Sequence, residues 1–299
     1  MQPSQRAAIG WLFGGIVLFA TMDAAAKWVG KTYPLTAAVW LRYLVPTLLV
    51  GGYLVATRGL KFAHAARPGI QILRGITLVI STLCFWTALS HLPLVEAVTV
   101  SFVCPTMVVI FSALLLGERP QRAHWIALAL GFVGVLIALR PGLTHTGIGA
   151  IAALSSATFY ALYLVLTRKV ADRADAVVLL FHANAIGALA LTVLAPATAR
   201  MPSIPAEWMI LPALGVFGAI GHWCMIKAYS LADATTLAPF MYAQLLVATF
   251  YGWLIYDNLP DAFTLLGMLV ILGSGLYVLN EGRKSSVRAR ADEVAATPE

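Results

Sequence analysis

Charged residues are scarce in this chain of 299 residues. Only 11% of the residues are charged, whereas 60% are hydrophobic. Soluble domains carry about 25% charged residues. The scarcity excludes an ordinary soluble domain, and a mean hydropathy of +0.85 favours a protein that lies in a membrane.

Cysteines and catalytic motifs are scarce too. Cys84, Cys104 and Cys224 lie in apolar segments without the CxxC or Cys/His spacing of a metal or redox site. The chain has no HExxH, no GxSxG, no Gly-rich nucleotide loop and no P-loop. We therefore expect no enzyme, no cofactor, no metal site and no direct use of ATP by this chain.

Long hydrophobic runs, in contrast, fill the sequence. Ten segments are apolar and long enough to span a bilayer, which takes about 20 residues each. They are 8–30, 35–57, 69–90, 94–116, 124–140, 147–168, 175–198, 207–230, 234–256 and 261–280. Lipid offers no hydrogen-bond partner to an open backbone, so the spans must be helices. We predict an all-α integral membrane protein with ten transmembrane helices.

The basic residues outside these spans gather on one side of the predicted membrane. That side holds Arg6, Arg58, Lys61, Arg67, Arg119, Arg122, Arg168, Lys169, Arg173, Arg283, Lys284, Arg288 and Arg290. The other side holds Lys31, Arg140 and Arg200. By the positive-inside rule both termini are cytoplasmic. The net charge of +7 is thus explained by topology and indicates no nucleic-acid partner.

The same segment pattern occurs twice, 140 residues apart. Ser90–Pro120 aligns with Ser230–Pro260 without a gap, so that Phe102 matches Tyr242 and Cys104 matches Gln244. Five spans per copy make the second copy enter the membrane upside down, a construction that many secondary transporters use. We expect two inverted five-helix repeats, 1–146 and 147–282, and a disordered cytoplasmic tail, 283–299.

Ionisable side chains inside the spans are costly and mark interior positions. Asp23 and Lys27 stand four residues apart on one helix face and are expected to pair, with Arg42 at the same depth. This cluster either fixes the first two helices together or attracts a substrate carboxylate. Arg74 and Lys227 are expected to extend to the cytoplasmic interface, and either could instead guard an inner gate. The charge network or gate therefore comprises Asp23, Lys27, Arg42 and Lys227.

Aromatic and amphipathic residues near the middle of the spans are candidates for a substrate cavity. The set is Trp86, Phe102, Tyr160, Tyr163, His222, Trp223, Tyr242 and Gln244. Several could instead belong to the aromatic belt at the membrane surface. Pro105 and Pro239 interrupt repeat-related spans and are candidate hinges. Glycines in the fifth and tenth spans predict close helix packing, within the chain or across a homodimer interface.

These segments resemble the drug/metabolite transporter superfamily of EamA type. The resemblance rests on Ala88-Leu-Ser-His-Leu-Pro-Leu-Val-Glu-Ala, Pro105 and Gly117-Glu118-Arg119-Pro120. A second copy runs from Ala228-Tyr-Ser through Pro239 to Asp257-Asn-Leu-Pro260-Asp261. The resemblance implies a bacterial inner-membrane carrier with ten helices around a central cavity. Asn258 replaces Glu118 in the second copy, so a role for that carboxylate would not be duplicated.

Within this superfamily, the aromatic cavity is similar to that of exporters of aromatic and other neutral amino acids. Met22-Asp-Ala-Ala-Ala-Lys27 and Pro239-Phe-Met-Tyr242 also resemble uptake or exchange carriers for S-adenosylmethionine or riboflavin. We expect the chain to move a small-molecule substrate by alternating access, and we favour export. A membrane scaffold that transports nothing is the remote alternative.

Overall fold

The computed structural model describes residues 3–63, 67–117, 122–140, 147–171, 175–193, 195–198, 200–231, 240–241 and 243–295. All regular structure within these residues is helical. The first half contains α1 (Pro3–Val29), α2 (Leu35–Arg58), η1 (Gly59–Ala63), α3 (Pro68–His91), α4 (Leu94–Ser101), α5 (Cys104–Leu116) and α6 (Arg122–Leu139). The second contains α7 (Gly147–Ala171), α8 (Ala176–Thr192), α9 (Ala195–Thr198), α10 (Pro205–Leu231), α12 (Ala243–Tyr256) and α13 (Ala262–Ala295).

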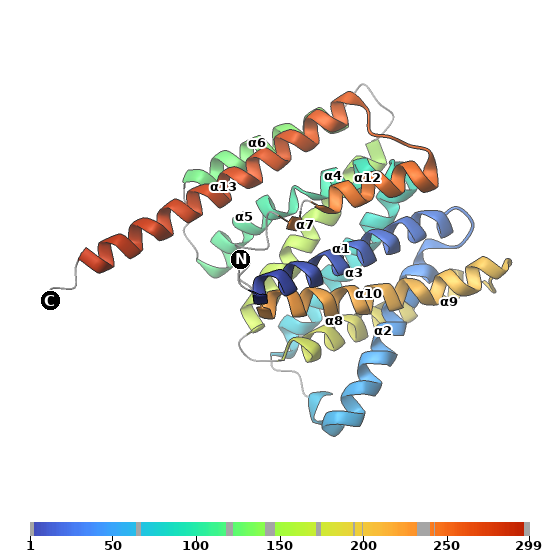
Figure 1. Cartoon of the computed structure of the whole chain (residues 1–299). Coiled ribbons are helices and arrows are strands. Elements are labelled where there is room, and N and C mark those ends of the chain that lie inside the picture. The colour runs from blue at the N-terminus through green and yellow to red at the C-terminus, as the bar shows by residue number, and fades with distance from the viewer. Residues whose placement is uncertain are drawn as a thin grey trace.

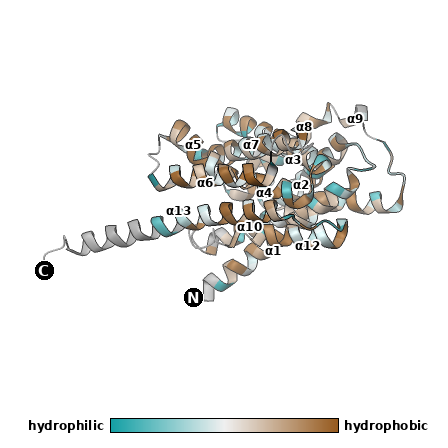
Figure 2. Cartoon of the chain, turned by 90° about the horizontal axis from the view of Figure 1, so that it is seen from above, coloured by the Kyte–Doolittle hydropathy of each residue, from teal (hydrophilic) through white to brown (hydrophobic). Residues whose placement is uncertain are grey.

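The prediction of ten apolar helices is confirmed for the described residues. Six segments are long and apolar enough to cross a membrane, and four shorter apolar helices complete the set. One long segment, Leu94–Leu116, is interrupted between α4 and α5. Hydrophobic residues predominate along α1, α10 and α12, and many large apolar side chains are exposed, as expected of a surface that faces lipid (Figure 2).

The helices of the two halves pack in symmetric pairs. In the repeat, α1 is equivalent to α7 and α3 to α10, so the α1–α10 contact is equivalent to the α7–α3 contact. The α2–α8 and α6–α13 contacts each join two equivalent helices. An odd number of spans per half inverts the second copy, as predicted. Both termini lie at the same end of the bundle (Figure 1). We call this the terminal end, and the opposite end the loop end.

Glycine permits the closest of these contacts. A Cβ atom on Gly267 would lie 2.5 Å from the Gly134 carbonyl oxygen, so α6 and α13 meet backbone to backbone. Figure 1 shows the two helices side by side. The close helix packing predicted from the glycines therefore occurs within the chain at Gly134 and Gly267. Gly273, in contrast, faces open space.

The expectation of a disordered tail is corrected for residues 283–295. Helix α13 continues to Ala295 and extends beyond the terminal end of the bundle (Figure 1). Ala, Glu, Lys and Arg are good helix formers, so a polar composition alone does not exclude helix. Residues 296–299 lie outside the described part of the chain.

Candidate functional site

Three polar side chains from three helices are linked electrostatically in the interior of the bundle. They are Asp23 of α1, Arg42 of α2 and His222 of α10, and we call them the central cluster. Asp23 and Arg42 are each only 6% exposed. The Arg42 guanidinium acts electrostatically on both Asp23 and His222, while the His222 ring packs edge-on against Phe19, with centroids 4.9 Å apart.

Tyr43 forms a fixed platform for Arg42. Arg42 Cζ lies 4.6 Å from the centroid of the Tyr43 ring. The ring is fully buried, and its hydroxyl donates to the Leu78 carbonyl oxygen at 2.9 Å and lies 2.7 Å from Thr82 Oγ1. Among the described residues, the buried Nε of Arg42 has no hydrogen-bond partner. The central cluster thus presents a positioned cation with a donor still to be satisfied.

Lys27 does not join this cluster, which corrects the expected pairing with Asp23. Its Nζ donates to the Leu92 carbonyl oxygen at 2.6 Å and to that of Leu89. The last carbonyl groups of a helix have no partner within the helix, so the ammonium of Lys27 satisfies the end of α3. Asp23 is left with Arg42 as its cationic neighbour.

Arg74 is also placed differently from the sequence expectation. It is 1% exposed and does not extend to the membrane surface. Its Nε donates to Thr167 Oγ1 at 2.9 Å, and its other nitrogens donate to the Leu179 carbonyl oxygen at 3.3 Å and to Gln71 Oε1. Helices α7 and α8 cover the terminal-end half of α3, and their contacts with it keep the guanidinium in the interior.

Two predicted tyrosines lie beside Arg74. The Arg74 guanidinium carbon is 5.3 Å from the centroid of the Tyr163 ring, and Tyr163 stacks on Tyr160 with centroids 5.8 Å apart. Tyr163 is also an electrostatic neighbour of Tyr43. Tyr43 thus lies against Arg42, and Tyr163 lies against Arg74.

The other predicted substrate residues are more dispersed. Trp86 is buried in the core, Phe102 lies at the break between α4 and α5, and Gln244 is half-buried in the first turn of α12. Trp223 is exposed on α10, with Lys227 Nζ 5.3 Å from its ring centroid. Their roles stay predictions. Tyr242 and Pro239 lie outside the described residues.

The helix interruption at the first candidate hinge precedes the proline. Helix α4 ends at Ser101, and α5 begins at Cys104, which puts Pro105 in its first turn. A proline in the first turn costs no helical hydrogen bond, because the backbone N–H groups of the first turn have no acceptor within the helix. The hinge role of Pro105 stays a prediction.

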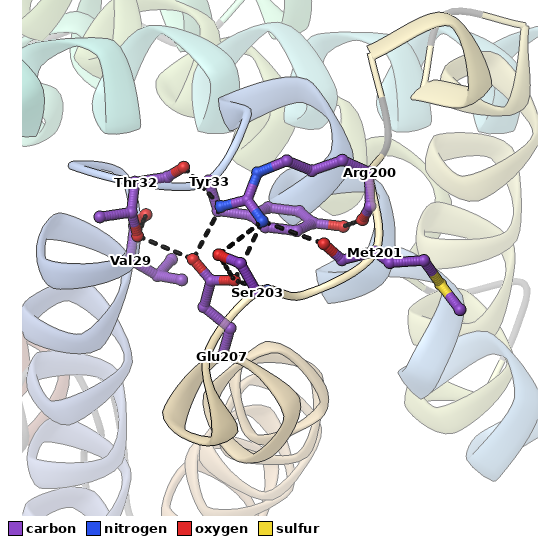
Figure 3. Close-up of polar contacts among 7 residues, drawn as sticks. All are labelled: Val29, Thr32, Tyr33, Arg200, Met201, Ser203 and Glu207. Carbon is purple, nitrogen blue, oxygen red and sulfur yellow. Dashed lines mark hydrogen bonds and ion pairs between the residues drawn. The ribbon is translucent and has the colours of Figure 1, made fainter.

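A polar network that sequence reasoning missed closes the loop end of the bundle (Figure 3). Glu207, in the first turn of α10, is fully buried. Its carboxylate accepts two hydrogen bonds from Arg200 (2.8 and 3.2 Å), one from the Ser203 amide (2.7 Å) and one from Thr32 Oγ1 (2.9 Å). An acidic residue just after Pro205 is a helix-start signal that could have drawn attention to it.

The same network joins the two halves of the chain. Arg200 donates to the Thr32 carbonyl oxygen at 2.7 Å, and the Tyr33 hydroxyl donates to the Arg200 carbonyl oxygen at 2.9 Å. At the terminal end, Arg58 and Asp175 also join the halves, but by a single contact of 3.2 Å between side chains that are 42% and 44% exposed. The bonds at the loop end thus involve the fully buried Glu207, whereas the Arg58–Asp175 pair is exposed.

The sequence pattern of the EamA-like transporter family matches this chain twice, over residues 6–140 and 147–280. The chain belongs to the EamA-like transporter family. As such it is a transporter, and its relatives together with its apolar helices make it a multi-pass protein of a bacterial membrane.

The named relatives to which this EamA-like chain is similar carry different compounds. The pseudopaline exporter CntI of Pseudomonas aeruginosa (strain UCBPP-PA14) is 29% identical over 85% of this chain and 89% of its own length. The S-adenosylmethionine uptake transporter of Rickettsia bellii is 25% identical, with 93% and 94% covered. The riboflavin transporter of Vibrio cholerae is 24% identical, with 94% and 95% covered.

A protein of known crystal structure shares the fold of this EamA-like chain. It superposes with a TM-score of 0.65 at 21% sequence identity, over 93% of this chain and 98% of the other. This similarity covers both halves of the chain and agrees with the ten-helix architecture. The family match establishes a transporter, and the solved structure shows the fold alone.

Proposed function

We propose that the chain is a secondary carrier for an amino acid or an amino-acid-derived metabolite. The central cluster is the observation that carries this proposal. Arg42 offers a guanidinium with a buried Nε donor that has no partner among the described residues, and Asp23 offers a carboxylate within its electrostatic range. A zwitterionic amino-acid head group has the complementary charges, so its carboxylate would bind Arg42 and its ammonium would bind Asp23.

The network of contacts between the halves fits alternating access. Opening the site to the loop end requires Thr32 and Tyr33 to separate from Glu207 and Arg200. Opening it to the terminal end requires the Arg58–Asp175 contact and the bonds of Arg74 to Thr167 and Leu179 to separate. Both changes can be made by moving one half against the other about the central cluster. We further propose that the terminal end faces the cytoplasm, because most of the basic loop residues lie there.

Export of aromatic and other neutral amino acids is the form we favour, since a tyrosine ring packs against each of the two buried arginines. Uptake or exchange of S-adenosylmethionine is the second candidate, and the named Rickettsia relative supports it. That compound also carries an amino-acid head group, whereas riboflavin does not. The central cluster therefore favours the first two substrates over the third.

Flux into proteoliposomes tests the proposal directly. Labelled phenylalanine, leucine, S-adenosylmethionine and riboflavin are compared, and we expect movement of an amino-acid-bearing compound. Movement of riboflavin alone would refute the substrate class and keep the transporter. Failure of every metabolite in a broad mixture to move would favour the scaffold alternative.

Substitution of Arg42 tests the site itself. Arg42→Gln should lower the flux by about 10- to 150-fold, because a hydrogen bond to a charged group contributes about 1.5–3 kcal/mol. Arg42→Lys keeps the charge but loses the planar guanidinium fork, so its flux should lie between that of the unmodified protein and that of Arg42→Gln. Arg122→Gln is the matched control, since Arg122 is exposed at the start of α6. Equal flux in Arg42→Gln and in the control would show that Arg42 does not bind the substrate.

A further inference from the structure

Arg74 is a buried cation that binds no carboxylate among the described residues. Within the described part of the chain its three hydrogen bonds go to neutral acceptors, namely a threonine hydroxyl, a glutamine amide oxygen and a backbone carbonyl. A guanidinium has five N–H donors, so two remain available. An isolated charge is costly to bury, and in membrane helices such charges mark the path of a substrate or an ion.

Gln71 supplies a second, independent indication of a ligand. It stands one helical turn before Arg74 on α3 and is 1% exposed. Its Oε1 accepts from Arg74, but its Nε2 has no hydrogen-bond partner among the described residues. A buried amide N–H group that makes no hydrogen bond costs free energy. Arg74 and Gln71 thus place unsatisfied donors side by side, which is the chemistry of a site for a carboxylate.

The location of this pair relates it to the central cluster. Arg42 lies about 10 Å along α2 from its loop end, and Arg74 lies about 9 Å along α3 from its terminal end. The two arginines therefore occupy opposite halves of the bundle. Tyr43 contacts the first, Tyr163 contacts the second, and the two tyrosines are neighbours.

We propose that Arg74 and Gln71 form a second carboxylate subsite, which receives the substrate's carboxylate after it enters through the terminal end and before it reaches Arg42. The inference rests on the proposed function, because it assumes a substrate that carries a carboxylate. Arg74 is held in place by Thr167 and Leu179, while the donors of Gln71 and the remaining donors of Arg74 bind the anion.

Gln71→Glu is the sharpest variant, because it places a carboxylate of the protein itself beside Arg74. The new ion pair should leave the unfolding midpoint equal or higher, while flux falls at least about tenfold because the subsite is occupied. Gln71→Met is the matched control, since it removes the amide without adding a charge, and its flux should exceed that of Gln71→Glu. Equal loss in the two variants would show that a carboxylate placed beside Arg74 has no effect of its own, and would overturn the proposal.

Anion binding by the unmodified protein gives a readout that does not depend on transport. Sodium acetate, as the carboxylate probe, should raise the unfolding midpoint of the purified protein by about 2–4 °C more than sodium chloride at equal ionic strength. It should also slow amide exchange in α3 around Gln71 and Arg74. Gln71→Glu should abolish both effects. Equal stabilisation by chloride would overturn the assignment to a carboxylate, and absence of protection in α3 would overturn the subsite.

The two proposals fail in distinguishable ways. If Gln71→Glu transports normally, the second subsite is wrong and the carrier proposal stands. If no amino-acid compound is moved, yet acetate protects α3 in the unmodified protein and not in Gln71→Glu, the proposed substrate is wrong and the anion subsite stands.

Discussion

Gly187 of α8 sets the position of the tyrosine on which Arg42 rests. A Cβ atom added at Gly187 would lie 2.6 Å from Tyr43 Cδ1 and 2.9 Å from both Cγ and Cε1. The ring has no room to retreat, because it is fully buried and its hydroxyl is bound to Leu78 and Thr82. Gly187→Ala must therefore displace Tyr43 or α8, and with them the support of Arg42.

The magnitude follows from a comparison with Gly52→Ala in α2, where an added Cβ meets nothing within 4 Å. Both variants change glycine to alanine inside a helix, so the gain in helix propensity of about 1 kcal/mol cancels. The remaining difference is overpacking, which costs about 1–3 kcal/mol. At about 2–4 °C per kcal/mol for proteins of 150–250 residues, Gly187→Ala should unfold at least about 2 °C below Gly52→Ala.

Thermal unfolding of the purified protein and flux into proteoliposomes are the two assays. We expect Gly187→Ala to unfold earlier and to transport several-fold more slowly than Gly52→Ala. Equal unfolding midpoints would show that the contact between α8 and Tyr43 yields without cost. A lower midpoint with unchanged flux would separate the packing of Tyr43 from the function of Arg42, and would refute the view that the platform positions the site.

Two further predictions concern the ends of the bundle. Glu207→Gln removes the charge that binds Arg200, so amides in the loop between α1 and α2 should exchange faster by mass spectrometry; unchanged exchange would mean that the network does not hold the loop end. Burial alone would raise the pKa of Asp175, but hydrogen bonds from Val177 and the Arg58 guanidinium outweigh it and lower the pKa below its ordinary value of 3.8. Asp175→Ala should therefore cost about 0.5–2 kcal/mol of unfolding free energy at pH 7, a difference that disappears as the pH falls through the lowered pKa; a cost independent of pH would contradict this.

Much of the architecture could be predicted from sequence because the bilayer imposes strong constraints. Each span must be a helix of about 20 apolar residues, and the hydropathy of the chain therefore marks the ten helices. The gapless match of Ser90–Pro120 with Ser230–Pro260 predicted the inverted repeat, which the symmetric helix contacts support. The sequence expectation differs from the structure at the tail, where helix α13 continues through a polar segment.

The polar partners could not be predicted in the same way. Spacing along a helix gives the depth of a charge in the membrane, at 1.5 Å per residue, and it correctly selected Asp23 and Arg42 as interior groups. It also offered Lys27 as the partner of Asp23, because the two residues share a helix face. The structure directs Lys27 to the end of α3 instead, where unpaired carbonyl groups accept its hydrogen bonds.

The sequence by itself determined that this chain crosses a membrane ten times in two related halves and buries a few charges. Only the tertiary structure decided which groups those charges meet. Arg74 shows the reason: its distance from the helix end allowed it to reach the surface, but α7 and α8 cover that side of α3. A residue's depth is a property of its own helix, whereas its partners depend on how neighbouring helices are rotated and packed, and that is set by contacts far apart in the chain.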